Sequence, residues 1–147
     1  MRIAIEQLQL VELLSFLREQ AEDTFPDLRD SERLRTLAEK WHSFAEFCTC
    51  RDKNGVLKGM VVFYANRPDV GVAYIPHVYV RGESRGQGIM SSMFKFIEGY
   101  VKEKGFTSLC LEVQKSNEIA QRAYIHYGFL YCGEASEKSI YLQFRIL

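Results

Sequence analysis

The sequence predicts an α/β fold, a mixed central β-sheet flanked by helices in the order β-α-α-β-β-β-α-β-α-β-β. Two patterns indicate this fold class: apolar residues recur at helical spacing in some stretches, and they alternate or run together in others. The third observation is the length. A chain of 147 residues has the size of one domain, so we expect residues 1–147 to form a single domain.

The first part of the chain predicts one strand and two helices. Residues 1–6 form a short strand, and residues 8–25 form a helix because leucines recur there at helical spacing, at Leu10, Leu13, Leu14 and Leu17. Pro26 ends this helix. The second helix begins at Asp30 or Ser31, either of which can cap a first turn, and its apolar stripe is Leu34, Leu37 and Trp41.

Three strands are predicted next. Residues 43–51 and 56–65 form a hairpin, because Lys53-Asn54-Gly55 between them is a tight-turn signal. Residues 71–80 form the third strand. Pro76 lies inside that strand and cannot donate to a sheet ladder, so it is expected at an edge or a bulge.

The rest of the chain alternates between helices and strands. A loop at residues 81–88 leads into a helix at 89–104, which is apolar along one stripe and is followed by Gly105. Residues 106–113 form a strand. Asn117 caps a helix that ends at Gly128, and residues 129–133 and 139–146 form the final hairpin.

Composition narrows the function classes. Lys and Arg total 19, as do Asp and Glu, and this balance argues against nucleic acid as a partner. The apolar stretches are far shorter than the roughly 20 residues that cross a bilayer, so no membrane partner is expected. The cysteines lack metal-type spacing and are expected to be free, mostly buried thiols of a cytoplasmic protein, with no metal site: Cys48, Cys50, Cys110 and Cys132.

The most informative segment is the strand, loop and helix at residues 78–92. Gly86 and Gly88 allow the backbone to approach a ligand, and the first turn of the next helix presents unpaired N–H groups. Arg85 adds a positive charge beside them. These features favour a phosphate or pyrophosphate site, with a plain strand-to-helix turn as the alternative. The loop lacks both the Walker pattern and the third glycine of a Rossmann fingerprint.

A second motif follows about 30 residues later. It comprises Leu111, Val113, Asn117, Ala120, Tyr124, Gly128 and Phe129. Together with Arg85-Gly86-Gln87-Gly88-Ile89, this motif resembles the two signatures of the GCN5-related N-acetyltransferase (GNAT) family. The order and spacing of the two segments fit the family as well. One residue departs from the pattern: Met90 stands where a small residue is usual, so its side chain is expected to turn toward the core.

The resemblance implies acetyl-CoA as the cofactor and assigns residues to it. Backbone groups of Val78, Tyr79 and Val80 would meet the pantetheine arm. The pyrophosphate would be held by main-chain N–H groups of the loop and by one hydroxyl, which together involve Arg85, Gly86, Gln87, Gly88, Ile89, Met90 and Ser91. Asn117 and Ala120 would lie along the cofactor, and Tyr124 would stand near its sulfur.

The chemistry of acyl transfer to an amine requires a deprotonated amine, a donor for the developing oxyanion and a proton for the leaving thiolate. The Val78 N–H is the candidate oxyanion donor, and Tyr124 is the candidate acid, with a packing role as its alternative. His77 is a candidate base, and Glu112 is another, acting through a water. For both residues a structural or solvated role is the alternative, and a relay without a single base stays open.

The sequence therefore predicts an acyl-CoA-dependent N-acyltransferase that moves acetyl from acetyl-CoA to a primary amine of a small molecule or peptide. The alternatives are a non-catalytic CoA or acyl-CoA sensor, or regulatory module, and an assembly domain. A homodimer is also left open. The acidic run at 19–30 could serve a cationic acceptor or be a solvated helix end, and Trp41 and Phe44 could line an acceptor pocket or belong to the core.

Overall fold

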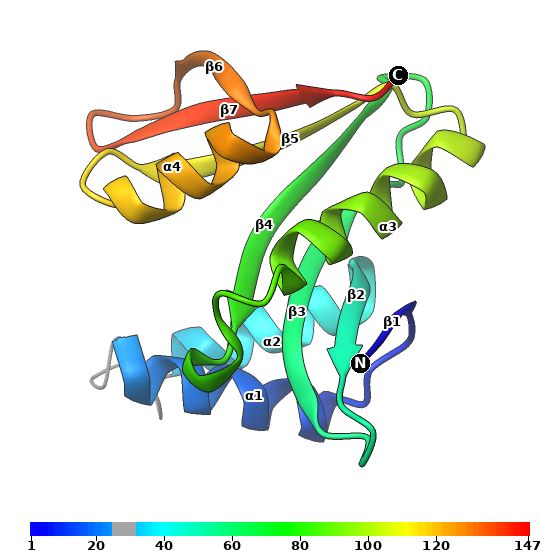
Figure 1. Cartoon of the computed structure of the whole chain (residues 1–147), viewed down its shortest axis with the longest axis vertical. Coiled ribbons are helices and arrows are strands. Elements are labelled where there is room, and N and C mark those ends of the chain that lie inside the picture. The colour runs from blue at the N-terminus through cyan, green and yellow to red at the C-terminus, as the bar shows by residue number, and fades with distance from the viewer. Residues whose placement is uncertain (25–31) are drawn as a thin grey trace. The chain divides into compact units, whose positions relative to one another are not determined.

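The computed structural model describes residues 1–24 and 32–147 and has a mixed seven-stranded sheet flanked by helices (Figure 1). Its elements are β1 (Arg2–Ile5), α1 (Leu10–Thr24), α2 (Glu32–Phe44), β2 (Glu46–Arg51), β3 (Leu57–Tyr64), β4 (Val72–Val80), α3 (Ile89–Glu103), β5 (Ser108–Gln114), α4 (Glu118–Tyr127), β6 (Leu130–Glu134) and β7 (Ser139–Arg145). The predicted fold class and element order are confirmed. The helix-ending Pro26 and the caps Asp30 and Ser31 lie outside the described residues.

Hydrogen-bonded strands follow the order β1-β2-β3-β4-β5-β7-β6. β4 and β5 pair in parallel, with Val72–Ile75 facing Ser108–Leu111, whereas β1–β2, β2–β3, β5–β7 and β6–β7 pair antiparallel. Pro76 follows the last residue of the β4–β5 ladder, where a missing N–H donor does not interrupt that pairing.

The chain forms two compact units. The first combines residues 1–63 with 77–96, and the second combines 64–76 with 97–147. β4 and α3 each contribute residues to both units.

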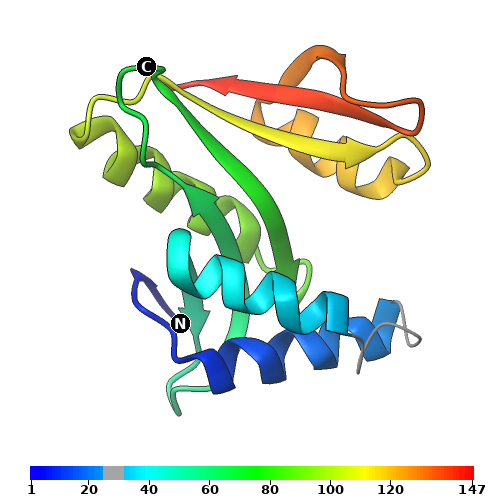
Figure 2. The same cartoon turned by 180° about the vertical axis from the view of Figure 1, so that it is seen from behind.

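In the first unit, helices cover both faces of the sheet. α1 and α2 run side by side (Figure 2) and contact the β4 side chains His77 and Tyr79. On the other face, the Cys48 thiol of β2 donates a hydrogen bond to the Met93 carbonyl of α3. This face also holds Cys50, and both cysteines are buried as predicted, whereas Cys110 is half-buried and Cys132 is exposed.

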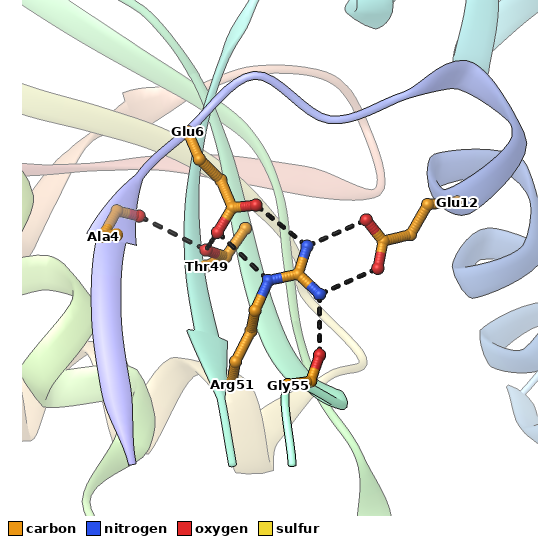
Figure 3. Close-up of polar contacts among 6 residues, drawn as sticks. All are labelled: Ala4, Glu6, Glu12, Thr49, Arg51 and Gly55. Carbon is orange, nitrogen blue, oxygen red and sulfur yellow. Dashed lines mark hydrogen bonds and ion pairs between the residues drawn. The ribbon is translucent and has the colours of Figure 1, made fainter. Parts of the chain in front are cut away.

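A hydrogen-bond network centred on Arg51 connects the start of α1 to β2 (Figure 3). The Arg51 guanidinium donates to both oxygens of Glu6, both oxygens of Glu12 and the Gly55 carbonyl. Its hydrogen bonds hold the pKa of Glu6 below the usual range. Arg51 is only 11% exposed, so this network fixes the entry of α1 against the sheet with every guanidinium nitrogen satisfied.

The largest boundary difference from the sequence prediction lies at the start of β2. The strand predicted from residue 43 begins at Glu46, because α2 runs on to Phe44 and the Ala45 N–H donates to the Trp41 carbonyl at 2.8 Å. The loop at 81–88 contains a 3₁₀ turn at Gly82–Ser84. The predicted hairpin at Lys53-Asn54-Gly55 is confirmed, with the Asp52 carboxylate accepting the Asn54 and Val56 N–H groups.

In the second unit, α4 packs on one face of the β5–β7–β6 sheet. The rings of Tyr127, Phe129 and Phe144 pack against one another in tilted pairs at centroid distances of 5.2–6.0 Å. No helix within the described parts of the chain is long and apolar enough to cross a membrane.

Candidate functional site

The loop before α3 adopts a backbone that requires glycine. Gly86 has φ +79° and Gly88 has φ +76°, a region that other residues rarely adopt. A Cβ at either position would meet no atom within 4 Å, so these glycines serve the backbone conformation and do not relieve a clash. The predicted loop is therefore built around two left-handed residues, and its surface beside them is open.

The first turn of α3 begins directly at this loop. The first helical hydrogen bond runs from the Ser92 N–H to the Gly88 carbonyl at 3.0 Å. The N–H groups of Ile89, Met90 and Ser91 precede it and have no acceptor within the helix. With the positive end of the helix dipole, these donors suit a diphosphate, so the residues present fit the acidic part of acetyl-CoA.

Gly59 positions this helix start and was not recognised from the sequence. A Cβ on Gly59 of β3 would lie 3.2 Å from Ile89 Cγ2 and 3.1 Å from Met93 Cε. The missing side chain lets α3 lie directly on β3. The only sequence signal was an isolated glycine inside a strand pattern, which indicates a close approach but not by what.

The side chains of the loop and of the first turn of α3 differ in their contacts and in their exposure to solvent. The guanidinium of Arg85 stacks over the Tyr79 ring at 5.6 Å, and its Nε donates to the Val80 carbonyl at 2.9 Å. Ser91 and Gln87 are exposed and Ile89 is buried. Met90 is half-buried, and its turn toward the core stays a prediction.

The end of β4 carries the next group of predicted residues. Tyr79 is buried and its ring packs edge-on against Phe16 of α1, at 5.6 Å. Val78 and Val80 alternate with it and are half-buried. Val78 and Val80 therefore point away from α1, on the opposite side of β4 from Tyr79.

His77 faces the two N-terminal helices. Its Nε2 donates to Gln20 Oε1 at 2.5 Å, and its ring lies 5.1 Å from that of Trp41. Burial lowers the pKa of His77 to about 4, so the imidazole is neutral at physiological pH. Trp41 belongs to the core beside it, whereas Phe44 is 70% exposed.

The second unit holds the other predicted signature. The Asn117 side chain caps α4 by accepting the Ala120 N–H at 3.2 Å, as the sequence predicts. Gln121 donates to the carbonyls of Gln114 and Lys115, which fixes the turn between β5 and α4. Ala120 is half-buried one turn before Tyr124.

Tyr124 and Glu112 are the two titratable candidates in this unit. The Tyr124 ring lies 6.0 Å from Phe129, and burial raises the pKa of its hydroxyl to about 12. The phenol is therefore protonated at neutral pH and able to donate. Glu112 of β5 is exposed, and its Oε2 accepts a hydrogen bond from the Ser139 hydroxyl at 2.5 Å.

The predicted site residues thus fall into two groups. The first unit brings together His77, the β4 end at 78–80 and the loop at 85–91, while the second unit carries Glu112, Asn117, Ala120 and Tyr124. Of the acidic run at 19–30, Glu19 forms an ion pair with Arg81, and the part from residue 25 lies outside the described residues.

Comparison with known proteins points to one family. The sequence model of the family described as Acetyltransferase (GNAT) family matches residues 11–129 of this chain. A comparison with curated proteins found no match.

Solved structures share the fold. The chain is similar to the PaiA N-acetyltransferase from Thermoplasma acidophilum, solved with coenzyme A, at 16% identity and a TM-score of 0.74, with 99% of each chain covered. It is similar to the ribosomal-protein-S18-alanine N-acetyltransferase from Escherichia coli at 17% identity and a TM-score of 0.73, covering 99% of this chain and 94% of that one. Nourseothricin acetyltransferase gives 24% identity and a TM-score of 0.63, with 70% of this chain covered, and the match spans 66% of that protein's length.

Proposed function

Because this chain belongs to the GNAT acetyltransferase family, we propose that it transfers an acetyl group from acetyl-CoA to a primary amine of a small molecule or peptide. The observation that carries the proposal is the loop at 85–89, where two left-handed glycines lead into the unpaired N–H groups of α3. Acetyl-CoA supplies the acetyl group as a thioester, which an amine can attack.

The loop residues would hold the cofactor. Main-chain N–H groups from Gly86 to Met90 suit the pyrophosphate, and the exposed Ser91 hydroxyl can add a further hydrogen bond. The Arg85 guanidinium, held over the Tyr79 ring, supplies positive charge beside the loop. Backbone groups of Val78 to Val80 are assigned to the pantetheine arm, and Asn117 and Ala120 are expected to lie along the cofactor.

Two residues are assigned to charge and proton handling. The Val78 N–H would stabilise negative charge that develops on the carbonyl oxygen. Tyr124 Oη holds a proton at neutral pH, which supports its assignment as the donor to the leaving sulfur. Only the Tyr124 role depends on a side chain, so Tyr124→Phe tests it directly.

For the proton of the amine, the surroundings of the two candidate bases support a water relay. His77 is neutral, but its Nε2 is already bonded to Gln20. Glu112 is exposed, so water reaches its carboxylate. We therefore propose that water passes the proton of the amine to the solvent. The base roles of His77 and Glu112 are the competing predictions, which pH-rate profiles of their variants would test.

A non-catalytic CoA sensor is the second candidate, and Met90 favours it. A half-buried methionine stands in the first turn of α3, where a larger side chain competes with a ligand for space. If Met90 crowds the pyrophosphate, Met90→Ala should tighten CoA binding. If it packs inward, the same change should lower only the melting temperature.

A titration with acetyl-CoA tests the proposal when two quantities are measured: the heat of binding and the amount of free thiol released. Binding with amine-dependent thiol release over a panel of primary amines is expected for the transferase. Binding without thiol release would favour the sensor, and no binding would reject both.

Compartment and assembly are proposed on separate grounds. The free cysteines support the cytoplasm, where thiols stay reduced. The edge strand β6 exposes Leu130 and Tyr131, which supports a homodimer. Light scattering after size-exclusion chromatography measures the mass in solution and so distinguishes a monomer from a homodimer.

A further inference from the structure

The sheet of the second unit has a polar face opposite α4. Side chains alternate along each strand, so Leu109, Leu111 and Phe144 point to the α4 face and their neighbours point the other way. Hydrogen bonds between strands mark this second face: Ser139 to Glu112, Gln143 to Ser108, and Cys132 to Gln143. We call this surface the Glu112 face.

The Glu112 carboxylate is held in place but carries an unbalanced charge. Its Oε2 accepts from Ser139, a fully buried residue whose hydroxyl also contacts Ser136 at 2.7 Å. Its Oε1 accepts no hydrogen bond from the residues that the structure describes, and no Lys or Arg among them pairs with it. An ordered, exposed carboxylate without a cation is suited to receive one from outside.

Two tyrosines flank this carboxylate. Tyr141 of β7 is directly opposite Glu112 in the antiparallel ladder. Tyr74 of β4 is opposite Cys110, two residues before Glu112, which makes it a diagonal neighbour within reach of a long side chain. Burial raises the pKa of Tyr74 to about 12, and the nearby Glu112, Tyr141 and Cys110 add to this shift.

A carboxylate between aromatic rings is the chemistry that recognises an alkylammonium ion. The carboxylate pairs with the charge, and the ring faces attract it in addition. The reacting nitrogen of the acceptor must be neutral to attack, and pairing with a carboxylate would oppose its deprotonation. The cation on this face is therefore a second one, which stays charged throughout the reaction.

We propose that Glu112, flanked by Tyr74 and Tyr141, binds a second positive charge of the acceptor, so that the preferred substrates are aliphatic diamines or lysine-like amines. This inference rests on the proposed acetyltransferase function. It makes Glu112 a specificity-determining residue and leaves the proton of the reacting amine to water.

A matched pair of probes tests the inference. Cadaverine has two primary amino groups, and aminopentanol of the same chain length has a hydroxyl in place of one of them. For wild type we expect a lower KM with cadaverine. Glu112→Gln should raise the KM for cadaverine roughly three- to tenfold and change the KM for aminopentanol less than about twofold.

Controls separate recognition from folding. Glu137→Gln removes an exposed carboxylate of the β6–β7 turn and should behave like wild type. Tyr141→Leu should weaken the preference for cadaverine, whereas Tyr141→Phe, which keeps the ring, should retain it. The affinity for acetyl-CoA should be the same in all these variants.

The outcomes distinguish this inference from the proposed function. Equal rises in KM for both probes would overturn the inference, and so would an equal fall in kcat with a shifted pH profile, which would make Glu112 the base. Thiol release without preference for cadaverine would reject the inference and keep the function. Calorimetric binding of cadaverine that Glu112→Gln weakens, without thiol release, would reject the function and leave Glu112 as a cation-binding residue of a protein that does not turn over.

Discussion

Gly59 of β3 lies against Ile89, the first residue of α3, so closely that a Cβ on the glycine would stand 3.2 Å from Ile89 Cγ2. The contact sets the position of the helix start whose N–H groups we assign to the cofactor. The proposed cofactor site therefore depends on the close packing of α3 on β3 as well as on the loop before α3.

Gly59→Val is expected to push α3 away from β3 and to weaken CoA binding as well as stability. Small-to-large changes in packed sites cost about 1–3 kcal/mol, so the melting temperature should fall by several degrees. Gly99→Ala is the control, because this glycine lies inside α3 with nothing within 4 Å of an added Cβ. This variant should be more stable than wild type, since alanine favours a helix over glycine. Unchanged CoA affinity in folded Gly59→Val, measured by calorimetry, would contradict the positioning role.

Gly88→Glu should abolish CoA binding, because it adds bulk and negative charge beside the N–H groups that suit the pyrophosphate. The same change at Gly105 makes a matched control. That glycine also has a positive φ, +92°, and open space around it, but it follows the C-terminal end of α3. Calorimetry on both variants separates backbone strain from loss of the site, and equal affinities would refute the assignment.

Tyr124→Phe should slow acetyl transfer about 10²–10⁴-fold while the affinity for acetyl-CoA changes little, because only the proton-donating oxygen is removed. Single-turnover rates are the right measurement, since product release can hide a chemical step. Tyr131→Phe, on the exposed edge strand, should have no effect. A single-turnover rate within about threefold of wild type would give Tyr124 a packing role.

His77 should make stability depend on pH between about 6.5 and 4. Its pKa is lowered in the folded protein to about 4, so the unfolded chain binds the proton first and stability is lost as the pH falls through this window. The loss is at most about 3 kcal/mol. Urea unfolding at a series of pH values should show a weaker dependence in His77→Gln. Parallel curves for the two proteins would show that His77 does not titrate as its surroundings indicate.

A single unfolding transition is expected if residues 1–147 are one domain, although they form two compact units. Trp41 is the sole tryptophan of the sequence and reports on the first unit, whereas circular dichroism reports on both. Coincident thermal curves are the expected result. Separate midpoints would divide the chain into two domains.

The features that the sequence by itself determined are those whose physical cause lies within a few residues. Asn117 caps α4 through an N–H three residues away, and the hairpin at Lys53-Asn54-Gly55 closes through the neighbouring Asp52. The loop with Gly86 and Gly88 is equally local, because backbone sterics decide which residues accept a positive φ.

Tertiary structure alone decided the surroundings of the candidate groups. His77 is neutral because Gln20 and Trp41 enclose it, and Gln20 is 57 residues away in the chain. Gly59 acquired its role from a helix that begins 30 positions later, and Glu112 has its tyrosine neighbours through the registers of two ladders. Such contacts depend on which faces pack together and on strand register, and residues distant in the sequence jointly set both.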